Sequence, residues 1–108
     1  MSNQDLDRLK DHVSTIVNNI ENGYKDDDTG EIVSGFDYLS DVLDIEYIVS
    51  SKKEYLGARV LVAFGGPNIW INTRTKQVEG YWCGDKSIQS YDNDEMDLDA
   101  TLAELYNC

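Results

Sequence analysis

Residues 58–82, ARVLVAFGGPNIWINTRTKQVEGYW, decide the fold that the sequence predicts. Apolar and polar side chains alternate along this stretch, and β-branched and aromatic residues are abundant, as in strands with one buried face. Residues 65–68 and 73–76 interrupt the alternation and are short enough to force antiparallel neighbours. With a further turn at residues 51–53 and a fifth, edge strand at residues 87–91, the pattern predicts a meander. Its four main strands are residues 45–50, 58–64, 69–73 and 77–82.

One amphipathic helix is predicted before the strands. Between residues 6 and 20 apolar side chains recur at steps of three and four, which collects them on a single helical stripe. Ser2 or Asn3 is suited to cap the start of this helix, and Gly23 is suited to its C-terminal end because glycine readily adopts positive φ. Residues 24–35 follow as a polar loop without a period.

Two further helices are predicted. Ser34, followed three residues later by Asp37, resembles a capping pair and predicts a second helix of two to three turns. Its apolar face would consist of Phe36, Leu39 and Leu43. Acidic residues in a first turn and apolar residues at helical spacing predict a closing helix over residues 94–106.

The order of these elements places two helices before the strands and one helix after them. This segregation predicts an α+β fold in which the helices pack on one face of an antiparallel sheet. A chain of 108 residues fits a single domain, residues 1–108. No apolar run reaches the roughly 20 residues that span a bilayer, and no signal segment begins the chain, so we expect a cytoplasmic protein.

Acidic residues are segregated along the chain. Residues 26–51 contain eight carboxylates and no Lys or Arg, a second such block runs from residue 87 onward, and the formal net charge is −12. Nucleic acids and anionic lipids are bound through Lys and Arg, so we expect neither direct nucleic-acid binding nor membrane binding. The charge instead favours a basic protein surface as the partner.

The acidic run at residues 26–31 invites a calcium interpretation, since hard cations bind clustered oxygens on a glycine turn. A calcium loop starting at Asp26 would need Gly at its sixth position and Glu at its twelfth, where this chain has Glu31 and Asp37. We therefore interpret the run as a solvated acidic loop and predict no metal site and no cofactor.

The usual signatures of an active site are absent from the sequence. His12 is the single histidine and has no matched nucleophile. Cys83 and Cys108 lack metal-ligand spacing and are expected as free thiols. The glycines of residues 65–68 join two predicted strands, which favours a hairpin turn over a phosphate loop. We expect a protein that is not an enzyme.

Two groups of carboxylates are candidates for partner binding. Asp37, Asp41 and Asp44 are separated by four and three residues, which predicts a ridge on the second helix, spaced similarly to phosphates along a DNA strand. Glu46 extends this first group. The second group consists of Asp92, Asp94, Glu95, Asp97 and Asp99. The alternative is that these charges only keep a small domain soluble.

Aromatic residues of the central strands are further candidates for partner binding. Tyr81 and Trp82 must lie on opposite faces of a strand because neighbouring side chains alternate. If helices cover one face, the other face would expose some of Trp70, Tyr81, Trp82 and Tyr47, as protein-binding surfaces often do. The alternative is that both tryptophans pack in the core.

Residues 65–73 and 78–82 resemble segments of small uncharacterised proteins carried by phages and mobile elements. The size and acidity of the whole chain are similar to those of anti-restriction and anti-CRISPR inhibitors, some of which mimic DNA. The resemblance implies an inhibitor.

These observations lead to one expected function and one alternative. We expect a non-enzymatic acidic inhibitor of the DNA-mimic type, which occupies a basic nucleic-acid-binding groove of a bacterial defence protein such as a CRISPR effector or a restriction enzyme. The alternative is an interaction or regulatory module that dimerises through its sheet, with acidity serving solubility only. Both a monomer and a homodimer are compatible with the sequence.

Overall fold

Three helices and one five-stranded antiparallel sheet make up the chain in a computed structural model that describes residues 3–108. The strands lie in the sheet in chain order, which confirms the α+β class and the meander. The elements are α1 (Asn3–Asn22), α2 (Gly35–Ser40), β1 (Asp44–Val49), β2 (Tyr55–Ala63), β3 (Asn68–Asn72), β4 (Gln77–Trp82), β5 (Asp85–Ser90) and α3 (Leu98–Asn107).

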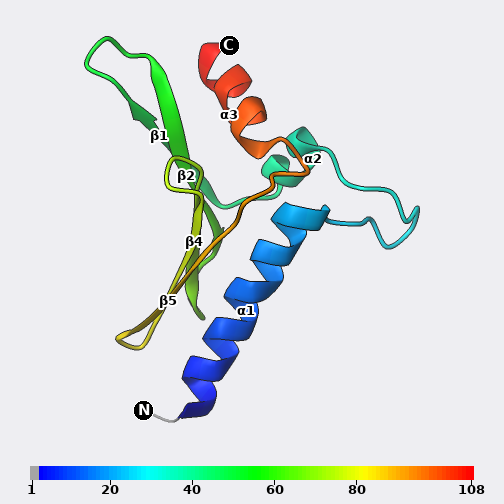
Figure 1. Ribbon diagram of the computed structural model, residues 1–108, viewed down its shortest axis with the longest axis vertical. Helices are drawn as coiled ribbons and strands as arrows, with labels where there is room; N and C mark the ends of the chain where they lie inside the picture. Colours follow the sequence, from blue (N-terminus) through cyan, green and yellow to red (C-terminus); the bar gives the residue numbers. More distant parts are fainter. Residues whose placement is uncertain (1–2) are drawn as a thin grey trace.

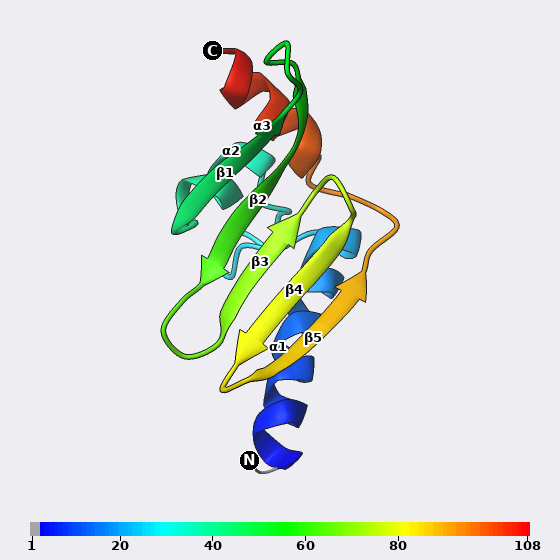
Figure 2. The same cartoon turned by 90° about the vertical axis from the view of Figure 1, so that its left-hand side faces the viewer.

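The helices lie on one side of the sheet and leave the other side uncovered (Figure 1). Helix α1 packs across β4 and β5, and α3 packs on β2. The sequence predicts that all three helices pack on the sheet. This prediction is wrong for α2, which packs mainly on α3. Figure 2 shows the uncovered side of the sheet, with the helices behind it. We call this side the open face, defined by the outward side chains of Arg59, Leu61, Trp70, Glu79, Tyr81 and Ile88.

The predicted stripe of α1 forms the helical half of the core. Gly23 ends the helix with φ of 93°, and its N–H donates to the Asn19 carbonyl at 2.9 Å, as expected. The cap expected at Ser2 or Asn3 lies outside the residues whose side chains are described. The buried stripe consists of Leu9, Val13, Ile16, Val17 and Ile20.

Strand alternation supplies the other half of the core. The helix-facing side chains at the centre of β2, β3 and β4 are fully buried, whereas their neighbours in the sequence lie on the open face; the buried ones are Ala58, Val60, Ile69, Ile71 and Val78. Antiparallel register places Val60 opposite Ile71 and Ile71 opposite Val78, so these side chains form one apolar row beneath α1 and α3. The period of two therefore separates a dry face from a face that carries charged and aromatic groups.

Helix α2 is shorter than predicted. It ends at Ser40 because the chain turns into the sheet: the Leu43 N–H donates to the Leu61 carbonyl at 2.9 Å, directly before β1. Leu39 is buried, but Phe36 and Leu43 are 51% and 60% exposed, so the predicted apolar face is wrong. The Ser34 cap is confirmed, since its hydroxyl accepts the Asp37 N–H at 3.1 Å.

The second strand begins earlier than predicted, and the last helix begins later. Strand β2 starts at Tyr55 and passes through Gly57, where an added Cβ would lie 3.0 Å from the Arg74 backbone. Helix α3 starts at Leu98, not at residue 94. Its first N–H groups are held by the Asp94 carboxylate, which accepts from Leu98 at 2.9 Å and from Asp99 at 3.1 Å.

Gly80 provides a test of the contact between α1 and the sheet. A Cβ at this position would lie 2.6 Å from Val13 Cγ2 and 2.8 Å from Leu9 Cδ1. Gly80→Ala should lower the free energy of unfolding in urea by about 1–3 kcal/mol because the core is overpacked. Gly66→Ala is the control, since a Cβ there meets nothing within 4 Å. Equal stability of the two variants would refute this contact.

Candidate functional site

A cleft between α1 and the segment that follows it gathers carboxylates from two parts of the chain. We call it the acidic cleft, and its acidic residues are Asp26, Asp27, Asp28, Asp37 and Asp41. His12 and Asn19 of α1 line the opposite wall, and none of the described residues around the cleft is Lys or Arg. The loop that carries three of these carboxylates projects away from the sheet, in cyan in Figure 1. The cleft therefore concentrates negative charge, and no Lys or Arg among its lining residues offsets this charge.

The acidic loop is a small hairpin and not the irregular loop that the sequence predicts. The Asp26 N–H donates to the Glu31 carbonyl at 2.9 Å, and the Val33 N–H donates to the Tyr24 carbonyl at 2.7 Å. The Asp26 carboxylate accepts the Asp28 N–H at 2.7 Å, which closes the turn. The Asp26 carboxylate thus stabilises the turn that carries Asp27 and Asp28.

Tyr38 of α2 and Tyr24 are the aromatic residues that line the cleft. Their rings meet edge to face, with centroids 6.1 Å apart. Burial, and to a lesser extent the neighbouring Tyr24, raise the pKa of the Tyr38 phenol, so this group stays neutral at physiological pH. An aromatic wall beside carboxylates suits the aliphatic stem and charged head of Lys or Arg.

The predicted ridge of Asp37, Asp41 and Asp44 does not form, because α2 ends before Asp41. Asp37 and Asp41 line the acidic cleft, whereas Asp44 and Glu46 lie on β1 and point to the open face. Sequence reasoning treated residues 26–28 as a solvated loop and missed their place opposite Asp37 and Asp41. No local signal gives this proximity, since it depends on how the loop folds back against α1.

The second predicted group of carboxylates has structural contacts of its own. Asp94 caps α3, as described above. The Asp99 carboxylate accepts the Tyr55 hydroxyl at 2.7 Å, and burial, together with this bond and the Asp99 charge, raises the pKa of Tyr55. The Asp92 N–H donates to the Glu21 carboxylate at 3.0 Å, and the Glu95 N–H donates to the Ile20 carbonyl at 2.9 Å. Asp97 adopts φ of 53° at the start of α3.

The open face carries an ordered network around Arg59. Its guanidinium pairs with Glu79 at 3.2 Å and with Glu46 at 3.5 Å, and it lies 4.3 Å from the Trp70 ring centroid. Glu79 also accepts the Tyr81 hydroxyl at 3.1 Å, and burial followed by the Glu79 charge raises the pKa of Tyr81. Within residues 3–108, Glu46 and Glu79 are the only carboxylates that make ion pairs.

The aromatic candidates divide between the two faces. Trp70 and Tyr81 lie on the open face, as the alternation allows. Trp82 and Tyr47 do not: Trp82 packs against the core, and the Tyr47 ring lies 5.2 Å from that of Tyr106 in α3. Arg59 was missed, because its partners come from β1, β3 and β4 and become neighbours only through the register.

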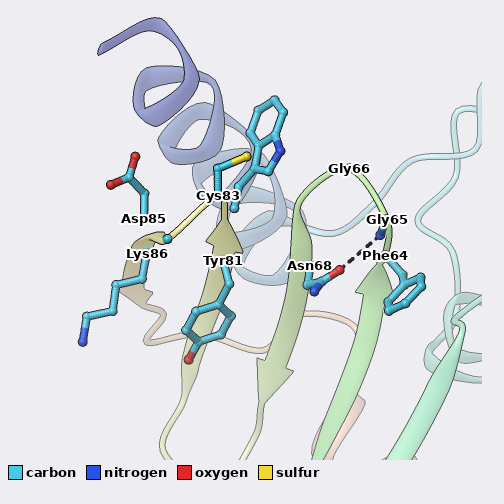
Figure 3. Close-up of a pocket in the computed structure, with 10 residues that line it drawn as sticks. Phe64, Gly65, Gly66, Asn68, Tyr81, Cys83, Asp85 and Lys86 are labelled. Carbon is cyan, nitrogen blue, oxygen red and sulfur yellow. Dashed lines mark hydrogen bonds between the residues drawn. The ribbon is translucent and has the colours of Figure 1, made fainter. Parts of the chain in front are cut away.

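A shallow depression lies at the end of the open face, between the β2–β3 and β4–β5 turns (Figure 3). Phe64, Tyr81 and Lys86 line it. The Asn68 side chain accepts the Gly65 N–H at 3.1 Å, which confirms residues 65–68 as a hairpin turn. Cys83 lies in the second turn with φ of 52°, and both cysteines are exposed free thiols.

The described residues contain neither a metal-binding cluster nor a membrane-spanning helix. Among them, no group of three or more His, Cys, Asp or Glu side chains is arranged to hold a metal ion. None of their helices has the length and apolar character needed to cross a membrane. No protein-family model matches the chain, and no curated protein or solved structure shows significant similarity to it.

The pKa of the buried Tyr91 phenol predicts how the free energy of unfolding responds to alkaline pH. Burial, and secondarily the charges of Asp94 and Asp99, raise the pKa of its phenol above the value of about 10 in an unfolded chain. The unfolded chain therefore ionises first, and the free energy of unfolding should fall as the pH rises above about 10. Tyr91→Phe should show a smaller decline in urea titrations from pH 8 upward. Identical declines in both proteins would contradict the raised pKa.

Proposed function

We propose that this protein is a non-enzymatic acidic binding protein, an inhibitor of the DNA-mimic type. It occupies a basic nucleic-acid-binding groove of a bacterial defence protein such as a CRISPR effector or a restriction enzyme. The observation that carries the proposal is the acidic cleft, in which five Asp residues converge and no Lys or Arg is present. Such a groove holds phosphates with Lys and Arg, which a cluster of carboxylates can engage in their place.

The energetic argument begins with the cost of gathering like charges. Each close pair of carboxylates costs roughly a few tenths of a kcal/mol through repulsion. Ion pairs within the described chain compensate only Glu46 and Glu79, neither of which lines the acidic cleft. A basic partner would relieve this repulsion on binding. It would also be attracted over a distance of about 8–10 Å at physiological salt.

The second group of carboxylates supports the proposal less directly. Asp94 and Asp99 stabilise α3 and its contact with β2. Asp92, Glu95 and Asp97 remain exposed and add to the negative field near the C-terminal end of α1. Their proposed role is attraction at long range, whereas the cleft makes the direct contacts.

The alternative function is an interaction or regulatory module that associates through its sheet. The open face favours this candidate, because an ordered Trp, Tyr and Arg cluster is the composition of many binding hot spots. The acidic cleft and the open face are different surfaces, so the two functions are compatible in one molecule.

Neutralising the cleft tests the proposal. The triple variant Asp28→Asn, Asp37→Asn, Asp41→Asn should weaken binding to a captured nucleic-acid-binding partner roughly 3- to 150-fold, since exposed ion pairs contribute about 0.2–1 kcal/mol each. Wild-type protein should also displace DNA from that partner. The melting temperature should stay unchanged or rise slightly, because repulsion between like charges is relieved.

A control with the same change in net charge separates the cleft from general acidity. Asp7→Asn, Asp11→Asn, Glu104→Gln removes three exposed carboxylates outside the cleft. Its affinity for the partner should remain close to that of the wild type in titrations over a range of salt concentrations. Affinity that is indifferent to the cleft substitutions and to salt would reject the proposal.

A further inference from the structure

The two edges of the sheet differ in how they are covered. Strand β5 packs against α1, and its Gln89 side chain donates to the Lys10 carbonyl at 3.3 Å and to the Ser14 hydroxyl at 2.7 Å. Strand β1 forms the opposite edge, where β2 is its one strand neighbour and none of the described helices packs extensively on it (Figure 2). The β1 edge is therefore the edge that residues 3–108 leave open.

Backbone groups along the β1 edge are available for pairing. In an edge strand every second residue points its N–H and C=O away from the neighbouring strand. Outside the pairing with β2, the described hydrogen bond of the backbone of residues 44–49 is a local one, from the Ile45 N–H to the Asp44 carboxylate at 2.9 Å. Lys and Pro, which commonly block natural edges, do not occur in residues 44–49. A register shift between Ile48 and Val49 ends the regular part of this edge.

Side chains along β1 are sorted by chemistry. Ile45 and Tyr47 lie on the side that the helices cover, since their partners in β2 are core residues. Tyr47 is nevertheless 37% exposed and can contact an added strand. Asp44 and Glu46 lie on the open face, where Arg59 offsets Glu46 and no ion pair within residues 3–108 offsets Asp44. A strand that complements this edge carries apolar residues on one side and basic residues on the other.

A second copy of β1 does not provide this complement. In antiparallel pairing of two copies, a two-fold axis at Glu46 would place the two Glu46 side chains opposite each other, and an axis at Ile45 would place Asp44 opposite Glu46. An axis at Tyr47 would leave the two Glu46 residues diagonal neighbours, about 7–8 Å apart. An axis further along would carry the pairing across the register shift. Like charges opposite each other destabilise paired strands, so the charge favours a basic segment of another protein.

We propose that the β1 edge binds an extended, basic segment of a partner protein, which adds a sixth strand to the sheet. Lys or Arg of this segment lies beside Asp44 and Glu46, and its apolar residues lie beside Ile45 and Tyr47. Main-chain hydrogen bonds provide the affinity for an added strand, and alternate side chains provide the specificity. No residue of β1 lines the acidic cleft, so this site goes beyond the proposed function and does not depend on it.

A peptide titration followed by NMR tests the added strand. The probe is a peptide of about seven residues in which Lys and Val alternate, added to about 1 mM. Binding should slow hydrogen exchange at amides of residues 45–48 and leave the amides of β5 unchanged, because the added strand supplies acceptors at β1 alone. The same peptide with methyl groups on its backbone nitrogens keeps its charge but cannot donate. It should bind at least about tenfold more weakly.

Matched charge variants separate the β1 edge from the general acidity of the chain. Asp44→Lys, Glu46→Lys should weaken binding of the unmethylated peptide at least about fivefold more than the control Asp7→Lys, Asp11→Lys, whose positions are exposed on α1. Asp44→Asn, Glu46→Gln should show a smaller loss in the same direction, and circular dichroism should show every variant folded. Unchanged exchange at β1, equal affinity of the methylated peptide, or equal losses in the Lys variants would each overturn the proposal.

Discussion

The close approach of α1 to the sheet at Gly80 is the constraint on which the rest of the structure depends. Because Gly80 has no Cβ, the Leu9 and Val13 side chains reach the backbone of β4, and the apolar stripe of α1 closes over β4 and β5. With α3 on β2, one face of the sheet is dry. No element among residues 3–108 covers the opposite face, so alternation along the strands places Trp70 and Tyr81 there.

Most charged side chains lie outside the core and make no ion pair within the described residues, so they are available to interact with a partner. The buried residues are almost all apolar, and the ion pairs within residues 3–108 all involve Arg59. A few carboxylates do support the fold, such as Asp94 at the start of α3 and Asp26 in the acidic turn. The remaining acidic residues lie outside the core. Their charges therefore determine the electrostatic field that a partner experiences more than they determine the stability of the fold.

Local patterns in the sequence predict most of the fold but little of the candidate sites. Alternation and helical spacing identify the meander and α1, since both depend on neighbours close in the chain. These patterns wrongly extend the second helix through Asp41. Helix α2 ends earlier because the Leu43 N–H donates to the Leu61 carbonyl, and this hydrogen bond depends on strand β2, which is distant in the sequence. The Arg59 network and the acidic cleft are missed for the same reason: each joins residues whose proximity follows from register and packing.

The response of stability to salt tests most directly the claim that repulsion between carboxylates outweighs ion pairing in the free energy of unfolding. Urea unfolding at pH 7 would be followed in NaCl from low concentration to about 0.3 M, a range over which the Debye length falls below about 10 Å. If uncompensated repulsion dominates, the free energy of unfolding should rise with salt and level off as screening becomes complete. A free energy of unfolding that falls as NaCl is added would show that ion pairs stabilise the fold, and it would contradict this account.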